Sequence, residues 1–561
     1  MAKIKEQKEK SLAQTLYDTA ELQRGKVAPS DYKDIALGLL FLKFITYWYD
    51  QRRAKIEKET KDESEKNRNY LLNLKTNYTS KGVFFLKKGD RWDDLKEVAS
   101  SEPNLAIKID GILQQIEKDN PSLEKVLPDV FATSEVKNDN LQQLIENFDS
   151  IKTNEVSKDT FGKIYEYFLK MFHKKSGEKA PNREAFGKFG SWLNSHVRKT
   201  YGRPMAFVAS ADLAGSTNIA GFSKDFEGEK DFGMYHRKNN KAGILVPQGI
   251  TEFANAGIMT GISSVNFDSS PYENHSGFIT ACSTYGSFSY LKYGAYRLYS
   301  QIAQDSQLKV GKTIWVAGHS GPETAEDFRT HFGIFAPGVT QLFPEGHILN
   351  LHPWEYNEVP VMLGAALKTD VPILALHLTR PPVEIPDREK LGMGSHFEAA
   401  RGAYLIKDYD EDRQKEGIIF VRGTSVISEL CKILSVIVAN GPNVKIVAAL
   451  SWGLFDMQDD EYKQNLIGED EWLDCMVITN TSIRNMGHWV KHSLVEEYSI
   501  SADWDDKWRH GGNLEEVIEE AHLSSDWQMK GIERFACDRE KRINRLKGSI
   551  PVELLEKMGM K

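Results

Sequence analysis

The sequence lacks the run of about 18 apolar residues that a membrane-spanning helix needs. Its longest apolar stretch, residues 35–44, is interrupted by Gly38 and Lys43, so no membrane span is expected. The charged start MAKIKEQKEK leads into no apolar segment, which argues against a secretory signal peptide. These absences predict a cytoplasmic protein.

Cysteine is also scarce. The 561 residues contain four, which are Cys282, Cys431, Cys475 and Cys537. They lie far apart and form no Cys-x-x-Cys pair, so neither a structural zinc site nor a disulfide framework is expected. This pattern fits a reducing compartment, and we assign no metal ligands to this chain.

Net positive charge is missing as well. The formal charge of −8 argues against a protein that coats nucleic acid along its whole length. The charge is uneven, because residues 1–100 contain 21 Lys/Arg and 16 Asp/Glu. The first part of the chain is therefore mildly basic and the remainder acidic.

The basic part shows helical periodicity. Apolar residues recur with a period near 3.6 at Tyr32, Ile35, Leu37, Leu40, Phe41, Phe44, Ile45 and Trp48. Pro29, Ser30 and Asp31 provide a helix start. We interpret the charged run 51–68 as a solvated helix face or a loop, and expect further helices over 140–148 and 159–172. Residues 1–178 are predicted to form an all-α domain.

After Gly177 the pattern changes to short apolar runs separated by Gly, Pro and Asn. The runs span residues 205–210, 312–318, 371–378, 417–421 and 444–450. Near-continuous apolar strands alternating with helices are typical of parallel sheets covered on both faces. We predict a multidomain protein in which two α/β domains with mainly parallel sheets, 179–385 and 415–561, follow the helical domain, with a linker at 386–414.

The helical block resembles a known family. Two segments carry the resemblance, LAQTLYDTAELQRGKVAPSDYKDIALGLLFLKFITYWYDQRR and DTFGKIYEYFLKMF. They are similar to the N-terminal helical domain of type I restriction-modification methyltransferase M subunits, over residues 8–175. No Asn-Pro-Pro-(Phe/Tyr) motif and no Gly-rich turn for the methyl donor follow. The resemblance implies contact with DNA or a methyltransferase partner through residues 1–178; the alternative is a helical packing module.

The larger part resembles transketolase. Six segments occur in transketolase order: SADLAGSTN, GITEFANAGIMTGI, STYGSFSYLKYGAYRL, AGHSGPETAEDFRTHFG, LHLTRPP and SWGLFDMQDDEY. The resemblance implies the pyrimidine-binding domain of this thiamine-diphosphate family at 179–385, followed by its C-terminal domain. It also implies a transferase that moves a two-carbon ketol unit between phosphosugars.

The resemblance assigns cofactor residues. Glu252 matches the glutamate that bonds the aminopyrimidine of the cofactor, although a Glu near a helix start is otherwise most often a capping residue. Tyr285 and Phe288 match its aromatic pocket, while the third aromatic position holds Leu291. Asp212, in the first segment, is assigned to cofactor binding too.

The same resemblance assigns substrate residues. His319, Asp327 and His331 keep the family's spacing, and proton transfer needs groups of this kind. Arg380, Ser216 and Arg183 match the phosphate-binding positions, and Arg is well suited to phosphate. One departure from the family is Phe328-Arg329, which replaces a Gly-Pro pair and could narrow the site or change the substrate.

One family element is missing. No Gly-Asp-Gly metal motif occurs, and Gly89-Asp90-Arg91 stands alone in a charged segment. We therefore expect a partner chain to supply the diphosphate site with Mg²⁺ or Ca²⁺, in a homo- or hetero-oligomer. The alternatives are a truncated or recombined gene that is inactive by itself, a regulatory protein that reuses the fold, and a non-catalytic protein associated with DNA or a methyltransferase.

Overall fold

The computed structural model describes residues 29–61, 63–79, 83–120, 123, 127, 131–132, 136–149, 174–226, 232–318, 320–323, 331 and 333–547. The chain divides into two compact units, residues 1–171 and 172–561. None of the described helices is both long and apolar enough to cross a membrane.

The first unit is helical, as predicted. Its helices are α2 (Pro29–Glu59), α3 (Glu65–Asn73), α4 (Thr76–Thr79), α5 (Trp92–Ala99), α6 (Leu105–Asp119) and α7 (Asn138–Asp149). The expected stripe buries Ile35, Phe41, Phe44 and Ile45, whereas Trp48 stays 48% exposed beside Tyr47. The charged run continues α2 to Glu59 and then forms α3. The helix expected over 159–172 lies outside the described residues.

A buried cation holds this unit together. Lys43 on α2 is 7% exposed, and its Nζ donates to the carbonyl oxygens of Phe148 at 2.5 Å and Asp149 at 2.8 Å. These carbonyls end α7, where a cation is favoured by the helix dipole. Burial lowers the pKa of Lys43 to about 8.

The second unit contains a six-stranded sheet in the order β3-β2-β4-β5-β7-β6. All five pairings are parallel, which confirms the predicted architecture. The strands are β2 (Ala206–Ala211), β3 (Leu245–Gln248), β4 (Ile279–Thr284), β5 (Thr313–Ala317), β6 (Ile348–Leu351) and β7 (Ile373–His377).

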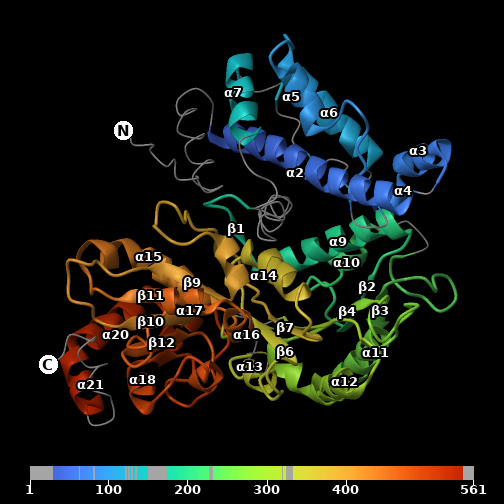
Figure 1. The fold of residues 1–561 in the computed structure, drawn as a ribbon. Helices are drawn as coiled ribbons and strands as arrows, with labels where there is room; N and C mark the ends of the chain where they lie inside the picture. The colour runs from blue at the N-terminus through green and yellow to red at the C-terminus, as the bar shows by residue number, and fades with distance from the viewer. Residues whose placement is uncertain are drawn as a thin grey trace, which may run out of the picture. The chain divides into compact units, whose positions relative to one another are not determined.

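Helices cover both faces of this sheet. They are α9 (Asn182–Tyr201), α10 (Gly221–Lys224), α11 (Glu252–Ser263), η4 (Gly286–Lys292), α12 (Tyr293–Asp305), α13 (Ala336–Val339) and α14 (Glu358–Leu367). Figure 1 shows α9, α10 and α14 on one side of the strands, and α11 and α12 on the other. Outside the sheet, β1 (Lys179–Ala180) pairs antiparallel with β8 (Val383–Glu384).

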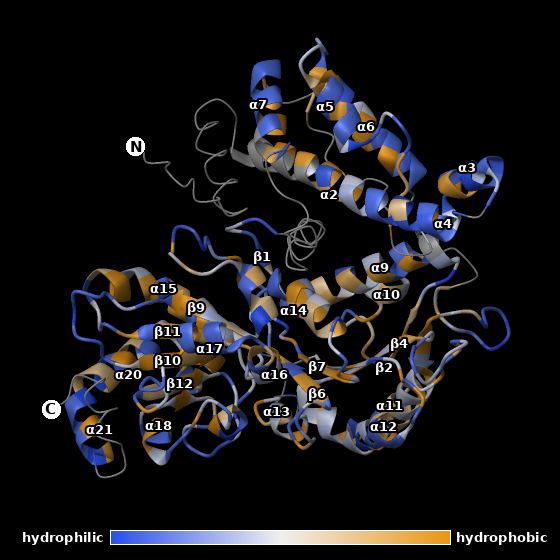
Figure 2. Ribbon diagram, viewed as in Figure 1, coloured by the Kyte–Doolittle hydropathy of each residue, from blue (hydrophilic) through white to orange (hydrophobic). Residues whose placement is uncertain are grey.

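A second sheet has the order β13-β12-β10-β11-β9. Its strands are β9 (Ala403–Lys407), β10 (Ile418–Arg422), β11 (Lys445–Ala449), β12 (Cys475–Thr479) and β13 (Ile500–Ser501). The pairings are parallel except for β9 with β11. Strands β10, β11 and β12 are buried throughout, and their apolar colouring is visible in Figure 2. Strand β9 lies inside the segment 386–414, which was predicted to be a linker, so that segment contributes an edge strand to this sheet.

Short helices surround the second sheet. They are η6 (His396–Arg401), α15 (Thr424–Asn440), α16 (Trp452–Asp456), α17 (Asp460–Leu466), η7 (Ile483–Met486), α18 (Ser493–Tyr498), α19 (Leu514–Glu520), α20 (Ser525–Cys537) and α21 (Arg539–Leu546). Buried polar contacts join the two sheets. Glu323, 1% exposed, accepts hydrogen bonds at Oε1 from the Ser425 hydroxyl at 2.6 Å and from Asn480 Nδ2 at 2.7 Å.

Candidate functional site

The predicted site residues gather at one edge of the six-stranded sheet. Asp212 directly follows β2, Tyr285 follows β4, Glu252 begins the helix after β3, and Arg380 comes three residues after β7. All four strands run parallel, so their carboxyl ends meet at this edge. In open α/β sheets this is the edge where ligands bind.

Glu252 is the first residue of α11 and is 5% exposed. Thr284, the last residue of β4, donates its hydroxyl to Oε1 of Glu252 at 3.1 Å. The carboxylate is thus bonded to the sheet edge. This bond comes from β4, and the N-cap residue of α11 is Thr251, so Glu252 is not the capping residue of its helix.

Two aromatic residues follow Thr284, the partner of this carboxylate, in the chain, and their rings lie beside His331. The ring centroids of Tyr285 and His331 are 5.0 Å apart, and those of Phe288 and His331 are 5.8 Å apart. The Tyr285 hydroxyl is hydrogen-bonded to the Ser216 hydroxyl at 3.1 Å. The fold therefore brings together residues that the resemblance assigned to three different roles.

The loop after β2 is held in a tight turn. Asp212 has φ +62°, a left-handed conformation that Asp tolerates better than most residues. Its N–H donates to the carbonyl of Ser210 at 2.9 Å. Arg183 on α9 donates from Nη1 to the carbonyl oxygen of Ser216. These bonds fix Ser216 opposite Tyr285.

Hydroxyl groups replace apolar contacts between β2 and β4. Ser283 donates to Ser210 Oγ at 2.8 Å, and Thr217 Oγ1 is hydrogen-bonded to Ser283 Oγ at 2.7 Å. Ser210 is 3% exposed, and Ser283 and Thr217 are fully buried. We refer to Ser210, Ser283 and Thr217 as the hydroxyl ladder. It ties the loop of Ser216 to the strand that carries Tyr285.

The structure does not describe every predicted residue. His319 and Asp327 lie outside the described residues, as does the Phe328-Arg329 departure. Arg380 is half-buried at the end of β7, two strands away from β4. Leu291, in the place of the third aromatic, is 40% exposed.

Sequence reasoning missed one buried cation near this edge. Lys292 is fully buried, and its Nζ donates to the carbonyls of Cys282 at 2.9 Å and Val316 at 3.0 Å. Burial lowers its pKa to about 8, against the opposing effect of Cys282 and Glu252. A single lysine in an aromatic segment gives no sequence signal, because lysine is mostly exposed.

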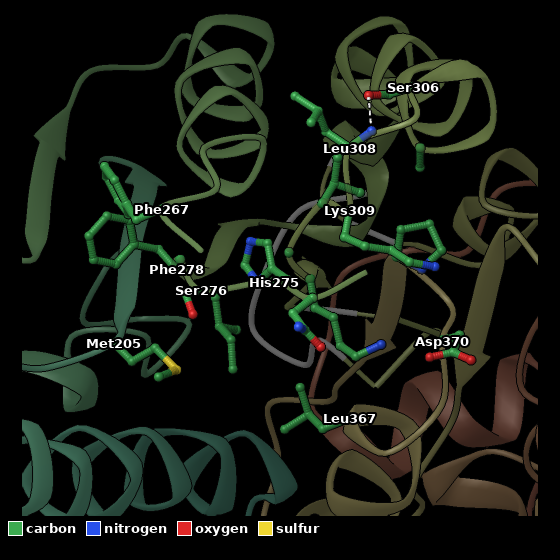
Figure 3. Close-up of a pocket in the computed structure, with 18 of the residues that line it drawn as sticks. Met205, Phe267, His275, Ser276, Phe278, Ser306, Leu308, Lys309, Leu367 and Asp370 are labelled. Carbon is green, nitrogen blue, oxygen red and sulfur yellow. Dashed lines mark hydrogen bonds between the residues drawn. The ribbon is translucent and has the colours of Figure 1, made fainter. Parts of the chain in front are cut away.

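A large cavity lies at the opposite end of the strands. Figure 3 shows His275, Lys309 and Asp370 around this space of about 1350 Å³. Met205, Lys312 and Pro372, which also line it, precede or begin strands at their amino ends. The cavity is therefore separate from the edge that carries Glu252.

Comparison with known proteins separates the chain into two parts. Residues 12–148 match the family model of the HsdM N-terminal domain. The MjaIX methylase subunit of a type I restriction enzyme from Methanocaldococcus jannaschii is 35% identical over 174 residues, which cover 29% of this chain and 31% of that protein. Transketolase 1 of Pasteurella multocida is 26% identical over 267 residues, which cover 47% of this chain and 35% of that protein.

The chain combines an HsdM-like domain with a transketolase-like part. A crystal structure of Pichia stipitis transketolase in complex with sedoheptulose-7-phosphate has the same fold, with a TM-score of 0.50 at 17% identity. That match covers 82% of this chain and 59% of the other. Both predicted resemblances are confirmed. The chain spans about a third of the length of the curated relatives that it matches.

Proposed function

We propose that the transketolase-like part is the pyrimidine-binding half of a thiamine-diphosphate-dependent transferase of the transketolase type. In this proposal the enzyme moves a two-carbon ketol unit between phosphosugars. Another chain supplies the half that binds the diphosphate and Mg²⁺ or Ca²⁺. The supporting observation is the buried Glu252 carboxylate, bonded to Thr284 immediately before the aromatic pair Tyr285 and Phe288.

The described residues fit the aminopyrimidine end of this cofactor. When bound, thiamine diphosphate supplies a nucleophilic carbon that can take up a ketol unit. Glu252 can share a proton with a ring nitrogen, because a buried carboxyl group forms strong hydrogen bonds. Tyr285 and Phe288 offer ring faces for stacking, and Asp212 stands at the neighbouring strand end.

Substrate handling falls to the remaining residues. His331, in contact with both aromatic rings, is placed to hold or move a proton on a sugar hydroxyl. We assign the same type of role to Asp327 and His319. Arg380, Ser216 and Arg183 are the proposed phosphate ligands. Arg183 already bonds the Ser216 carbonyl, but a guanidinium has five donors and can serve both partners.

The partner chain is supported by exposed apolar side chains at the same edge. Ile250 is 78% exposed, Phe253 58%, Tyr290 60% and Leu291 40%. They flank Glu252 and Phe288 in the sequence. Clustered exposed apolar groups of this kind are typical of protein interfaces. This edge is the expected docking surface for a diphosphate-binding chain.

The segment before the transketolase-like part, and the possible metal ligands of the described residues, bear on the same proposal. The segment that precedes the transketolase-like part matches the HsdM N-terminal domain. Across the described residues, no group of three or more His, Cys, Asp or Glu is arranged to hold a metal ion. The described residues thus fit the pyrimidine end of the cofactor and offer no such cluster for the metal.

Calorimetry with thiamine diphosphate and magnesium tests the proposal. The titration is run on the chain alone and with a separate diphosphate-binding domain of a transketolase. We expect binding and ketol transfer with both chains present, and at least a tenfold loss in Glu252→Ala. Glu273→Ala, which removes an exposed carboxylate from the same domain, serves as the control. Absence of binding and turnover in both settings would refute the enzyme, and an active Glu252→Ala would refute the cofactor site.

The HsdM-like domain motivates a second proposal, which is that it binds DNA or a methyltransferase partner. The proposal starts from its similarity to a methylase subunit alone. A mobility-shift assay with duplex DNA at 50 mM salt tests the first possibility, because contacts to phosphates weaken as salt increases. Unchanged migration at low salt would exclude DNA binding. Co-purification with a type I M subunit tests the second possibility.

A further inference from the structure

A small cavity lies between the carboxyl ends of the two sheets. Its volume is about 50 Å³. Asn350 and His352 come from the end of β6, Arg422 is the last residue of β10, and Ser451 follows β11. The backbone N–H of His352 donates to the carbonyl oxygen of Leu450 at 3.0 Å, which joins the end of β6 to the end of β11. Figure 1 shows β6 and α16 next to each other at this junction.

Arg422, on the wall of this cavity, is a buried cation with no acidic partner among the described residues. It is 4% exposed, and its Nη2 donates to the Thr481 hydroxyl at 3.1 Å. This is the guanidinium's single hydrogen bond to the described residues, and Nε is buried without a partner among them. Burial lowers the pKa of Arg422 to about 9, and no carboxylate in the described part of the chain counteracts this effect.

The other buried arginines of the described residues behave differently. Arg509 is 1% exposed and bonds Asp505, while Arg542 is 3% exposed and bonds Asp474 at 2.6 Å. A buried charge without a counterion is costly, which explains why these two are paired. Arg422 is therefore the exception that needs an explanation.

A second buried donor lines the same cavity. His352 is 7% exposed, and its Nε2 is buried and has no partner in the described part of the chain. Its ring stacks on His377, with centroids 4.2 Å apart. Burial, together with His377 and Arg422, holds the pKa of His352 well below its usual range. A neutral imidazole can donate one N–H. The donors that line the cavity therefore come from both sheets, because His352 follows β6 and Arg422 ends β10.

We propose that Arg422 and His352 form a binding site for a tetrahedral oxyanion, either inorganic phosphate or the phosphate end of a metabolite. The anion would neutralise the guanidinium and accept hydrogen bonds from both side chains, a combination that favours phosphate. The volume admits the oxyanion itself and little more. This site uses none of the residues assigned to the transferase, and its occupation would link the two sheets.

Thermal unfolding of the full chain tests the proposal. Phosphate is titrated from 0.1 to about 50 mM, with sodium chloride at matched ionic strength as the reference. Above the dissociation constant, we expect each tenfold increase in phosphate to raise the Tm by roughly 2 °C. Glycerol 3-phosphate forms the second arm. An equal response to it identifies the phosphate end of a metabolite, and a response to phosphate alone identifies the free ion.

Variants locate the site. Arg422→Met should abolish the phosphate response while keeping or raising the Tm in chloride, because it removes an unpaired buried charge. Arg422→Lys should weaken the response at least threefold in affinity. Arg484→Met, at a side chain that is 79% exposed on the nearby η7, should respond like wild type. Arg380→Met removes a proposed phosphate ligand of the transferase site. The part of the response that Arg422→Met abolishes should persist in it, which separates the two sites.

Two results would overturn the proposal. One is a wild-type Tm that responds equally to phosphate and chloride. The other is an undiminished phosphate response in Arg422→Met or Arg422→Lys. If Arg422→Met does not fold, isothermal calorimetry of wild type with phosphate provides the test. Absence of phosphate binding to wild type in that experiment would also refute the site.

Discussion

Replacing Arg388 by Met should destabilise the second unit in a pH-dependent way. Arg388 Nη2 lies 3.0 Å from Glu355 Oε1 and 2.8 Å from Glu358 Oε1. Both carboxylates are fully buried, and Glu358 also accepts a hydrogen bond from the Tyr404 hydroxyl at 2.6 Å. The substitution leaves two buried acids without their cation.

The sign of the pH dependence follows from the pKa values. Burial raises the pKa of Glu355 from 4.5 to about 7 and also raises that of Glu358. Between these values the folded state binds more protons than the unfolded state, so stability falls as the pH rises through this window. Arg388 lowers both pKa values, so its loss raises them and extends this pH window upward. The damage should therefore be larger at alkaline pH.

The expected magnitudes differ clearly at two pH values. Removing one partner of a buried ion pair costs about 3–5 kcal/mol, which we expect at pH 8. At pH 5 the acids can take up protons, and the loss should fall to about 1–2 kcal/mol from hydrogen bonds alone. Urea unfolding of wild type and Arg388→Met at both pH values measures the difference.

The control is Arg401→Met. Arg401 pairs with Glu398 at 3.3 Å, but its side chain is 45% exposed. Exposed pairs of this kind contribute less than about 1 kcal/mol. The control should therefore change little at either pH. An equal loss for Arg388→Met at pH 5 and pH 8, or a loss no larger than that of Arg401→Met, would refute the reasoning.

Two further predictions concern single residues. Lys43→Met should destabilise the first unit by about 1–3 kcal/mol, because it leaves the last carbonyls of α7 without their donor. The pKa of Lys43 is lowered from 10.5 to about 8 in the folded state, so the unfolded state binds more protons between these pH values. Urea unfolding should therefore show wild type, unlike the variant, becoming more stable as the pH rises through this range. Gly423→Ala should lower the Tm more than Gly346→Ala, since Gly423 has φ +117° and an added Cβ would lie 2.1 Å from Asn480, whereas Gly346 has φ +80° and open space. Equal Tm losses for the two glycine variants, or a Lys43→Met variant as stable as wild type, would contradict these arguments.

Most central strands were predictable because their apolar runs are nearly continuous. Strand β12 is equally apolar and buried, but no run was predicted over it. Strands β2, β5, β7, β10 and β11 all coincide with predicted runs. Strand β4, with the sequence Ile-Thr-Ala-Cys-Ser-Thr, was missed because its buried polar residues bond to side chains of β2, β5 and α11 instead of packing as apolar groups. Strands β3, β6, β9 and β13 are short edge strands, where little of the surface must be apolar.

The candidate-site residues were assigned from the family resemblance, without reference to strand ends. The structure adds that Asp212, Glu252 and Tyr285 follow β2, β3 and β4, and parallel topology collects such positions at one edge. The cavity of Arg422 and His352 was not predictable. Its residues come from two sheets, and nothing in the local sequence around Arg422 shows that its acidic partner is missing. Only the packed structure reveals an unpaired buried charge.

The hydroxyl ladder also affects how this protein can change over generations. Each hydroxyl of Ser210, Ser283 and Thr217 is bonded to another, so a single change to an apolar residue removes one hydrogen bond from a buried neighbour. The neighbours keep further bonds, such as those from Ser210 to the Ser283 carbonyl and from Thr217 to the Leu213 carbonyl. Single substitutions are therefore disfavoured, whereas replacing two or three hydroxyls together by well-shaped apolar residues avoids part of the cost. The core beneath the candidate site should thus tolerate drift less than the fully apolar core of β10 and β12.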